Sequence, residues 1–209
     1  MRTLAGNLYS TGNFLTSGTI PAAYPKGYNA FWTMKYEFSE QQYVDFLNTL
    51  DQTNATAKNN IGATGLVPNM VAPTPERAAR SFSPANVFAW LDWAAMRPMT
   101  ELEYEKAARG GNNTPSPLEY AWGNTTLAQV ATPTAQGTAT ETWASGNGAY
   151  ISGTGVMRCG ALATATSSRT SSGATFYGIM EMSGNTAEFT VYAAMHRVDP
   201  LLAFTAMVC

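Results

Sequence analysis

Few side chains in this sequence are of the types that carry out covalent or metal chemistry. The 209 residues include one histidine, His196, and two cysteines, Cys159 and Cys209. A zinc cage needs more of these residues than the chain has, and the two cysteines lie too far apart in the sequence to form a CxxC redox motif. A catalytic triad would need His196, and Asp199 is too near to it in sequence to define the geometry of a triad. We therefore interpret His196 as a surface or capping residue.

The first cysteine lies in a short apolar run. Cys159 follows Val156 and Met157, and only Arg158 beside it would lower the pKa of its thiol. In such a setting a cysteine is more often a buried, small apolar residue than a nucleophile. Two cysteines permit one disulfide, but spacing alone does not show that their Cα atoms come within about 7 Å. A bond between Cys159 and Cys209 therefore stays open.

Composition predicts one folded domain over residues 1–209. Apolar residues make up 45% of the chain and charged residues 12%, about half of the usual charged share of roughly 25%, which excludes a solvated, disordered chain. The net charge of −2 and the lack of a basic run disfavour nucleic acid as a partner. No apolar stretch approaches the roughly 20 residues that span a bilayer. The first residues lack the apolar core of a signal peptide, so we expect any export signal outside this chain.

The elements that position these residues begin with a strand and a helix. Residues 31–36 are aromatic or apolar for the most part and predict a strand. Ser39 and Gln42 form a capping box, and an apolar stripe at helical spacing follows over residues 43–50. We expect this stripe to pack into the core rather than to bind a partner.

Two further helices are predicted in the first half of the chain. Residues 51–82 are polar and interrupted by prolines, which predicts a long surface loop. Ser83 with Pro84 then marks the start of a helix. Thr100 and Glu103 form another capping box, which opens a helix that should end at a glycine pair.

The second half has weaker signals. Residues 124–175 are rich in Thr, Ser, Ala and Gly, which is typical of a flexible linker or of irregular but packed chain. Apolar residues such as Trp143 and Met157 favour the packed alternative. Residues 177–185 predict a strand that runs into a turn, and residues 188–192 predict the next strand. Helices in the first half followed by short strands predict an α+β domain.

Three blocks of sequence, in fixed order, resemble one family. They are residues 34–47 (MKYEFSEQQYVDFL), residues 97–110 (RPMTELEYEKAARG) followed by 121–124 (AWGN), and residues 178–188 (GIMEMSGNTAE). The chain resembles the formylglycine-generating-enzyme-like family, also called the sulfatase-modifying factor domain. The resemblance implies a C-type-lectin-like fold with two main helices, small antiparallel sheets and long irregular loops. Residues 1–30 would then be an extension or an edge strand.

The same resemblance bears on catalysis. Catalytic members bind Cu(I) through two cysteines separated by four residues near the C-terminal end, and soft Cu(I) needs thiolates. Past residue 188 this chain has only Cys209. Ergothioneine-type relatives need an iron site with several histidines, which His196 alone cannot supply. Residues 190–209, a divergent tail, also lack the family's Arg-Gly-Gly-Ser-Trp signature, so we expect a non-catalytic member.

One metal site of the family can be assigned to this chain by matching positions in the last block. In the enzymes, the last block holds a structural calcium ion through a side-chain oxygen, two backbone carbonyls and a glutamate. By resemblance these become Glu181, the carbonyls of Gly184 and Thr186, and Glu188. Hard oxygen ligands suit Ca²⁺, and two carboxylates would neutralise its charge. Glu181 departs from the Asn or Asp that is usual at its position, and solvated carboxylates without an ion are the alternative.

A scaffold without its catalytic cysteines predicts a non-catalytic, exported domain that binds a protein or other surface ligand, or joins a surface assembly. Residues 28–31 and 97–100 resemble variants from Bacteroidota, where such domains are often exported, so the expected location is extracellular or at the cell surface. One alternative is a copper-dependent, formylglycine-generating-type oxidase with an atypical site. A second is a structural subunit of a filament or surface layer, because few charged side chains would need desolvation between copies.

Overall fold

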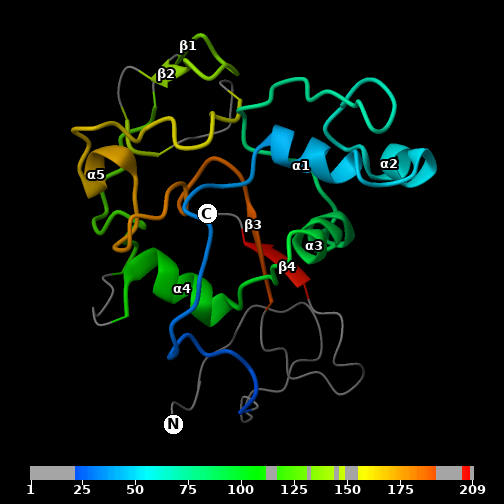
Figure 1. Ribbon diagram of the computed structural model, residues 1–209. Coiled ribbons are helices and arrows are strands. Elements are labelled where there is room, and N and C mark those ends of the chain that lie inside the picture. Colours follow the sequence, from blue (N-terminus) through cyan, green and yellow to red (C-terminus); the bar gives the residue numbers. More distant parts are fainter. Residues whose placement is uncertain are drawn as a thin grey trace.

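The computed structural model describes residues 22–111, 117–130, 133–143, 146–148, 155–191 and 204–207. Within these ranges the helices are α1 (Glu40–Leu47), α2 (Gln52–Lys58), α3 (Pro84–Trp93), α4 (Glu101–Arg109) and α5 (Arg169–Ser172). The strands are β1 (Pro133–Thr134), β2 (Thr142–Trp143), β3 (Glu188–Val191) and β4 (Phe204–Met207), and they form two antiparallel pairs, β1 with β2 and β3 with β4. Figure 1 shows α1, α2 and α3 on one side, α4 and α5 on the other, and β3 with β4 between them.

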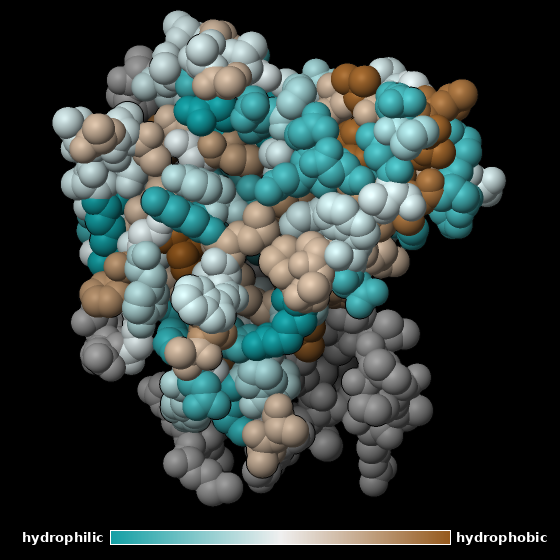
Figure 2. All heavy atoms as spheres, viewed as in Figure 1, coloured by the Kyte–Doolittle hydropathy of each residue, from teal (hydrophilic) through white to brown (hydrophobic). Residues whose placement is uncertain are grey.

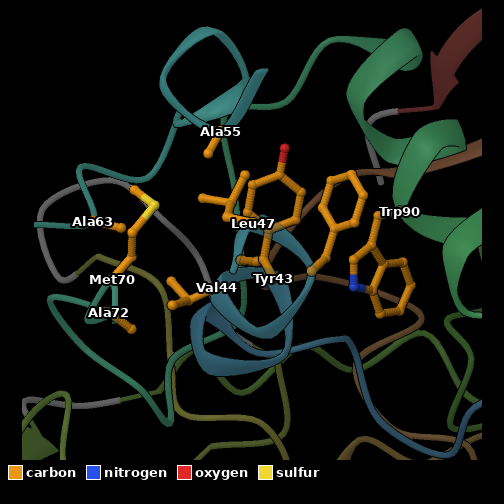
Figure 3. Packing of buried hydrophobic residues seen from close by; sticks show 10 residues of the cluster. Tyr43, Val44, Leu47, Ala55, Ala63, Met70, Ala72 and Trp90 are labelled. Carbon is orange, nitrogen blue, oxygen red and sulfur yellow. The ribbon is translucent and has the colours of Figure 1, made fainter. Parts of the chain in front are cut away.

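Helix α1 begins as predicted. The Ser39 hydroxyl accepts a hydrogen bond from the Gln42 N–H, and the Gln42 side chain accepts one from the Ser39 N–H, so both bonds of the capping box form. The apolar stripe is buried against Trp90 of α3, as the close view of Tyr43 and Leu47 in Figure 3 shows. Phe38 stacks on the Trp90 ring with the centroids 4.2 Å apart. The stripe is therefore core, as predicted.

The surface loop predicted for residues 51–82 is wrong in two respects. Asp51 caps α2 by accepting a hydrogen bond from the Asn54 N–H at 3.0 Å, so the segment opens with a helix. Beyond α2, small or flexible side chains turn inward and join the cluster of α1 (Figure 3), namely Ala63, Met70 and Ala72. These residues follow an irregular path, so their burial leaves no periodic pattern in the sequence.

Helices α3 and α4 begin after Ser83 and Thr100, as predicted, with Pro84 in the first turn of α3. Thr100 and Glu103 form both bonds of the second capping box, and Glu103 also pairs with Arg97 at 2.7 Å. The inner face of α4 belongs to a second buried cluster, which also includes Ile179 and Met182 of the last sequence block. The other buried members of the cluster are Tyr104, Ala107, Ala108 and Ala121. Helix α4 thus supports the segment that carries the predicted calcium ligands.

Where the structure describes residues 124–175, they are packed irregular chain, as predicted. Regular structure is limited to the two-residue strands β1 and β2 and the four-residue helix α5. The fully buried Glu141 accepts hydrogen bonds from the backbone N–H groups of Gly137 at 2.5 Å and Arg158 at 2.8 Å. Bonds of this kind replace the ladders of a regular sheet. A third cluster fills the interior here: Val130, Met157 and Ala161.

Of the three predicted strands, only the last is confirmed, as β3. Residues 31–36 and 177–185, all of them described, contain no strand. In the second segment Gly178, Glu181 and Asn185 have positive φ values, which an extended strand cannot include. A single backbone hydrogen bond, from Met180 N–H to the Lys35 carbonyl at 2.8 Å, joins the two segments.

Helices and small antiparallel strand pairs make this an α+β fold, as predicted. The described ranges hold three helices of eight to ten residues, α1, α3 and α4, where the resemblance implied two main helices. In the parts of the chain that the structure describes, no helix is both long and apolar enough to cross a bilayer.

Candidate functional site

The predicted calcium ligands lie on an irregular loop, residues 178–188, that other segments hold in place. The Asn185 Oδ1 accepts a hydrogen bond from the Met157 N–H at 2.8 Å. On α4, the Tyr104 hydroxyl donates to the Met182 carbonyl at 2.7 Å. Because the loop has no ladder of its own, these tertiary hydrogen bonds determine its shape.

Glu181 is the most constrained residue of this loop. Its φ of 63° lies in the left-handed region, which Asn and Asp tolerate better than Glu does. Its Oε1 accepts a hydrogen bond from the Gly160 N–H at 2.8 Å, whereas its buried Oε2 has no partner among the described residues. Burial, followed by the charge of Glu37, raises the pKa of Glu181 to about 8. An unpaired buried carboxylate oxygen is costly, so Glu181 Oε2 is the atom at this site most in need of a ligand.

A small pocket borders Glu181. Its polar lining includes Asn147, Ser183 and Asn185, with Gly184 beside them. The side-chain oxygens of those three residues already accept backbone hydrogen bonds, at 2.8 to 3.0 Å. Among the described residues, Glu181 Oε2 therefore remains the unpaired buried acceptor at this pocket.

The other three predicted ligands lie at or near the end of the same loop. Glu188 opens β3, and burial, followed by the charges of Glu37 and Glu181, raises its pKa well above its ordinary value. Within the described ranges, the carbonyl oxygens of Gly184 and Thr186 accept no hydrogen bond. The structure thus brings Glu181 and Glu188 into one electrostatic cluster, next to two carbonyl groups that have no donor among the described residues.

Glu37 is a residue of this cluster that the sequence analysis missed. Its carboxylate accepts hydrogen bonds from the Thr186 N–H at 3.0 Å, from the Thr186 hydroxyl at 2.5 Å and from the Asn185 side-chain amide. Burial is the main cause that raises its pKa to about 7. A signal was present, because Glu37 stands between Tyr36 and Phe38, and a charged residue in an aromatic run needs partners if the run is buried.

The oxygen atoms of this cluster are of the chemical type that hard divalent cations bind. Glu37 raises the pKa of both Glu181 and Glu188, and a cation would relieve that repulsion. Carboxylate and carbonyl oxygens are the ligands that Ca²⁺ prefers. In the described part of the chain, no three His, Cys, Asp or Glu side chains form a metal-binding group. A cation here would therefore depend on the backbone carbonyls as well as on two carboxylates.

Cys159 lies half-buried and free beside this cluster. Burial, followed by the charges of Glu37 and Glu181, raises the pKa of its thiol well above the usual range. The thiol is therefore protonated at neutral pH, which supports its interpretation as a small apolar residue. Cys209 and His196 lie outside the described residues, as does any contact between the two cysteines.

Two groups of exposed apolar side chains lie in the first half of the chain, among others elsewhere on the described surface. Trp32 is 101% exposed and Tyr28 is 79% exposed, both on the segment that leads to Glu37. Figure 2 shows strong hydrophobic colouring where α2 and the loop after it lie, and in that loop Leu66 and Val71 are 68% and 60% exposed. Large exposed aromatic and aliphatic side chains are typical of contact surfaces.

Comparison with known proteins identifies the family. No curated protein and no solved structure matches the chain. A family model described as "Sulfatase-modifying factor enzyme 1-like domain" matches residues 2–197. The matched range contains all three blocks on which the resemblance was based, and it covers far more than half of the sequence. The chain therefore belongs to the family of sulfatase-modifying factor enzyme 1-like domains.

Proposed function

We propose that this chain is a non-catalytic member of the family, with the C-type-lectin-like fold that membership implies, and that it binds a surface ligand or joins a surface assembly outside the cell. The cysteines are the main support. Oxidation of a thiol by copper needs two thiolates to hold the metal. Cys159 is half-buried beside carboxylates, its pKa is raised, and the sequence holds only one other cysteine, Cys209.

The exposed aromatic side chains support a role in recognition. Trp32 and Tyr28 project from a segment that the half-buried Glu37 anchors to the rest of the fold. Tyrosine and tryptophan supply a large contact area at a low cost in side-chain entropy, which makes them frequent at protein interfaces. A rigid framework that carries exposed aromatic residues on irregular segments suits a binding domain.

Copper binding and oxygen consumption test the non-catalytic assignment. We expect the purified chain to bind Cu(I) no more tightly than its Cys159→Ser variant does, in competition with a chromophoric chelator. We also expect no oxygen consumption with a cysteine-containing peptide. Tight Cu(I) binding that Cys159→Ser and Cys209→Ser each abolish, with thiol-dependent oxygen consumption, would establish the atypical copper oxidase instead.

The exposed patch at Leu66 and Val71 favours, as a second candidate, a subunit of a filament or surface layer. If copies pack through this patch, light scattering should detect species larger than 22.4 kDa as the concentration rises, and Leu66→Ser should reduce them. A monodisperse species of 22.4 kDa over a wide concentration range would remove this candidate.

We further propose that Ca²⁺ is a structural cofactor of the loop. Glu181 and Glu188 would supply carboxylate oxygens, and Gly184 and Thr186 would supply backbone carbonyls. The bound ion would contribute the positive charge that the buried carboxylates lack. Calcium at millimolar concentration should therefore raise the midpoint of thermal unfolding, whereas NaCl of equal ionic strength should not. The Glu181→Gln variant should lose this increase, and a wild-type midpoint that calcium leaves unchanged would contradict the proposal.

A further inference from the structure

Glu37 approaches the candidate calcium loop from a distant part of the sequence. It lies 149 residues before Thr186, yet it accepts two hydrogen bonds from that residue, through the N–H at 3.0 Å and the hydroxyl at 2.5 Å. Its second oxygen accepts a hydrogen bond from the Asn185 side-chain amide. Three donors therefore converge on one carboxylate, and both of its oxygens are engaged.

These hydrogen bonds fix the residues between the proposed ligands. Asn185 and Thr186 follow Gly184 and precede Glu188, so their backbone direction determines where the carbonyls at 184 and 186 point. Asn185 is held on two sides, because its Nδ2 donates to Glu37 while its Oδ1 accepts from Met157. The Thr186 N–H that Glu37 holds shares a planar peptide with the Asn185 carbonyl, and this plane lies between the two planes that carry the Gly184 and Thr186 carbonyls. Holding the middle plane limits how far each neighbouring carbonyl can turn.

We infer that Glu37 is a positioning residue for the cation site, a role that rests on the calcium proposal above. Three protein donors engage both oxygens of Glu37, so in this role it acts on the backbone of the loop rather than as a ligand of the ion. It holds the loop in the shape in which the carbonyls of Gly184 and Thr186 and the carboxylates of Glu181 and Glu188 serve one ion. The buried, unpaired Oε2 of Glu181 is the independent sign that this loop lacks a ligand.

The role requires a carboxylate rather than an amide. A glutamine at position 37 keeps one acceptor oxygen for Thr186 but places its NH₂ group against the Asn185 amide, so two donors face each other. Asn185 cannot rotate its amide to compensate, because its Oδ1 is needed by the Met157 N–H. Glu37→Gln should therefore loosen the loop without removing a ligand of the ion.

Calcium titration of the full chain tests this role. We would measure Ca²⁺ affinity by calorimetry on chelator-treated wild type, Glu37→Gln and Glu40→Gln. Glu40 is the matched control, because it is a buried carboxylate of α1 that accepts a hydrogen bond from the Thr74 N–H at 2.9 Å, away from the loop. We expect Glu37→Gln to weaken calcium binding at least tenfold and Glu40→Gln to leave the affinity within twofold of the wild type.

Two milder variants keep the test decisive if Glu37→Gln does not fold. Thr186→Val loses the hydroxyl that donates to Glu37, whereas Thr186→Ser keeps it. We expect Thr186→Val to weaken calcium binding several-fold and Thr186→Ser to restore affinity close to that of the wild type.

The outcomes separate the two proposals. A wild type that binds calcium, with Glu37→Gln and Thr186→Val binding as tightly as Glu40→Gln and Thr186→Ser, overturns the positioning role and leaves the calcium site standing. A wild type that gives no heat with calcium overturns the calcium site and the positioning role together.

Discussion

Two regions of this molecule reach a buried state by different means. Around α1 and α3, aromatic and aliphatic side chains pack at helical spacing, with Tyr43, Val44 and Leu47 fully buried. Around residues 178–188 polar side chains are buried beside apolar ones, and Glu37, Glu181 and Asn185 hold irregular backbone through hydrogen bonds; we call this the polar region. The apolar region gains stability from buried area, whereas the polar region mainly avoids the cost of unpaired groups.

The difference bears on function because the polar region holds a buried carboxylate oxygen that has no partner among the described residues. Both bonds of the capping box of α1 form, whereas Oε2 of Glu181 in the 178–188 loop is a buried acceptor that could take a ligand. Backbone hydrogen bonds link the regions, since the Ala78 N–H donates to the Met157 carbonyl at 3.2 Å and the Ala79 N–H to the Phe38 carbonyl at 2.9 Å. Substitutions in each region should therefore differ in size and in their response to calcium and pH.

The largest effect is expected in the apolar region. Leu47→Ala removes a fully buried side chain from the α1 cluster, and the neighbouring rings cannot collapse fully into the space. We expect the free energy of unfolding to fall by about 3–4 kcal/mol, equally with and without calcium. Denaturant titration measures this change, and a loss of less than about 1 kcal/mol would mean that the cluster is loosely packed.

The corresponding change in the polar region is Asn185→Ala. It leaves the buried Met157 N–H without its acceptor and removes one donor from Glu37, so we expect a loss of about 2–3 kcal/mol. The matched control is Asn48→Ala, which removes two hydrogen bonds to Met70 in the apolar region, at 2.8 and 3.1 Å, and should cost about 1–2 kcal/mol. Equal losses in the two variants would contradict a special role for the polar region.

Local and distant contacts also explain which elements could be predicted from the sequence. The starts of α1, α3 and α4 were predicted because their caps, Ser39, Ser83 and Thr100, are local signals that no distant contact overrides. The burial of residues 51–82 was missed because alanines on an irregular path show no period. Strand 177–185 was predicted wrongly because its apolar residues hide the positive φ of Glu181 and Asn185.

The residues of the candidate site also differ in whether the sequence alone could predict them. Glu181, Gly184, Thr186 and Glu188 came from a resemblance within one contiguous block, which a sequence displays directly. Glu37 was missed because its partners lie 148 and 149 residues away, and no local pattern encodes such a contact. Propensity describes neighbours along the chain, whereas a polar interior depends on groups that only the fold brings together.

The dependence of the unfolding free energy on pH should also distinguish the two regions. Burial raises the pKa of Glu37 from 4.5 to about 7 and that of Glu181 to about 8, so the folded chain holds these protons more tightly than the unfolded chain. Their contribution to stability is therefore fully present below pH 4.5 and is lost as the pH rises through 7 and 8. In chelator we expect unfolding free energy to fall by on the order of 1–2 kcal/mol between about pH 5 and about pH 8.

Urea titrations at the two pH values measure this dependence, and Glu181→Gln should reduce the slope because the amide does not titrate. Saturating calcium should also reduce it, since a bound cation favours the charged carboxylates. A calcium-free wild type that is equally stable at both pH values would show that these carboxylates are paired or solvated in the folded state.

The smallest effect concerns the helix caps and tests whether the two regions unfold together. Ser39 caps α1 in the apolar region, and Ser168 caps the four-residue α5, which lies near the pocket, with both bonds of a capping box in each case. Ser39→Ala and Ser168→Ala should each cost about 1 kcal/mol. If the molecule unfolds in one step, both losses appear in denaturant titration. If the polar region opens on its own, Ser168→Ala should instead speed amide hydrogen exchange at Ser171 and Ser172 and leave global unfolding unchanged, because a cap stabilises only the unit that opens with it.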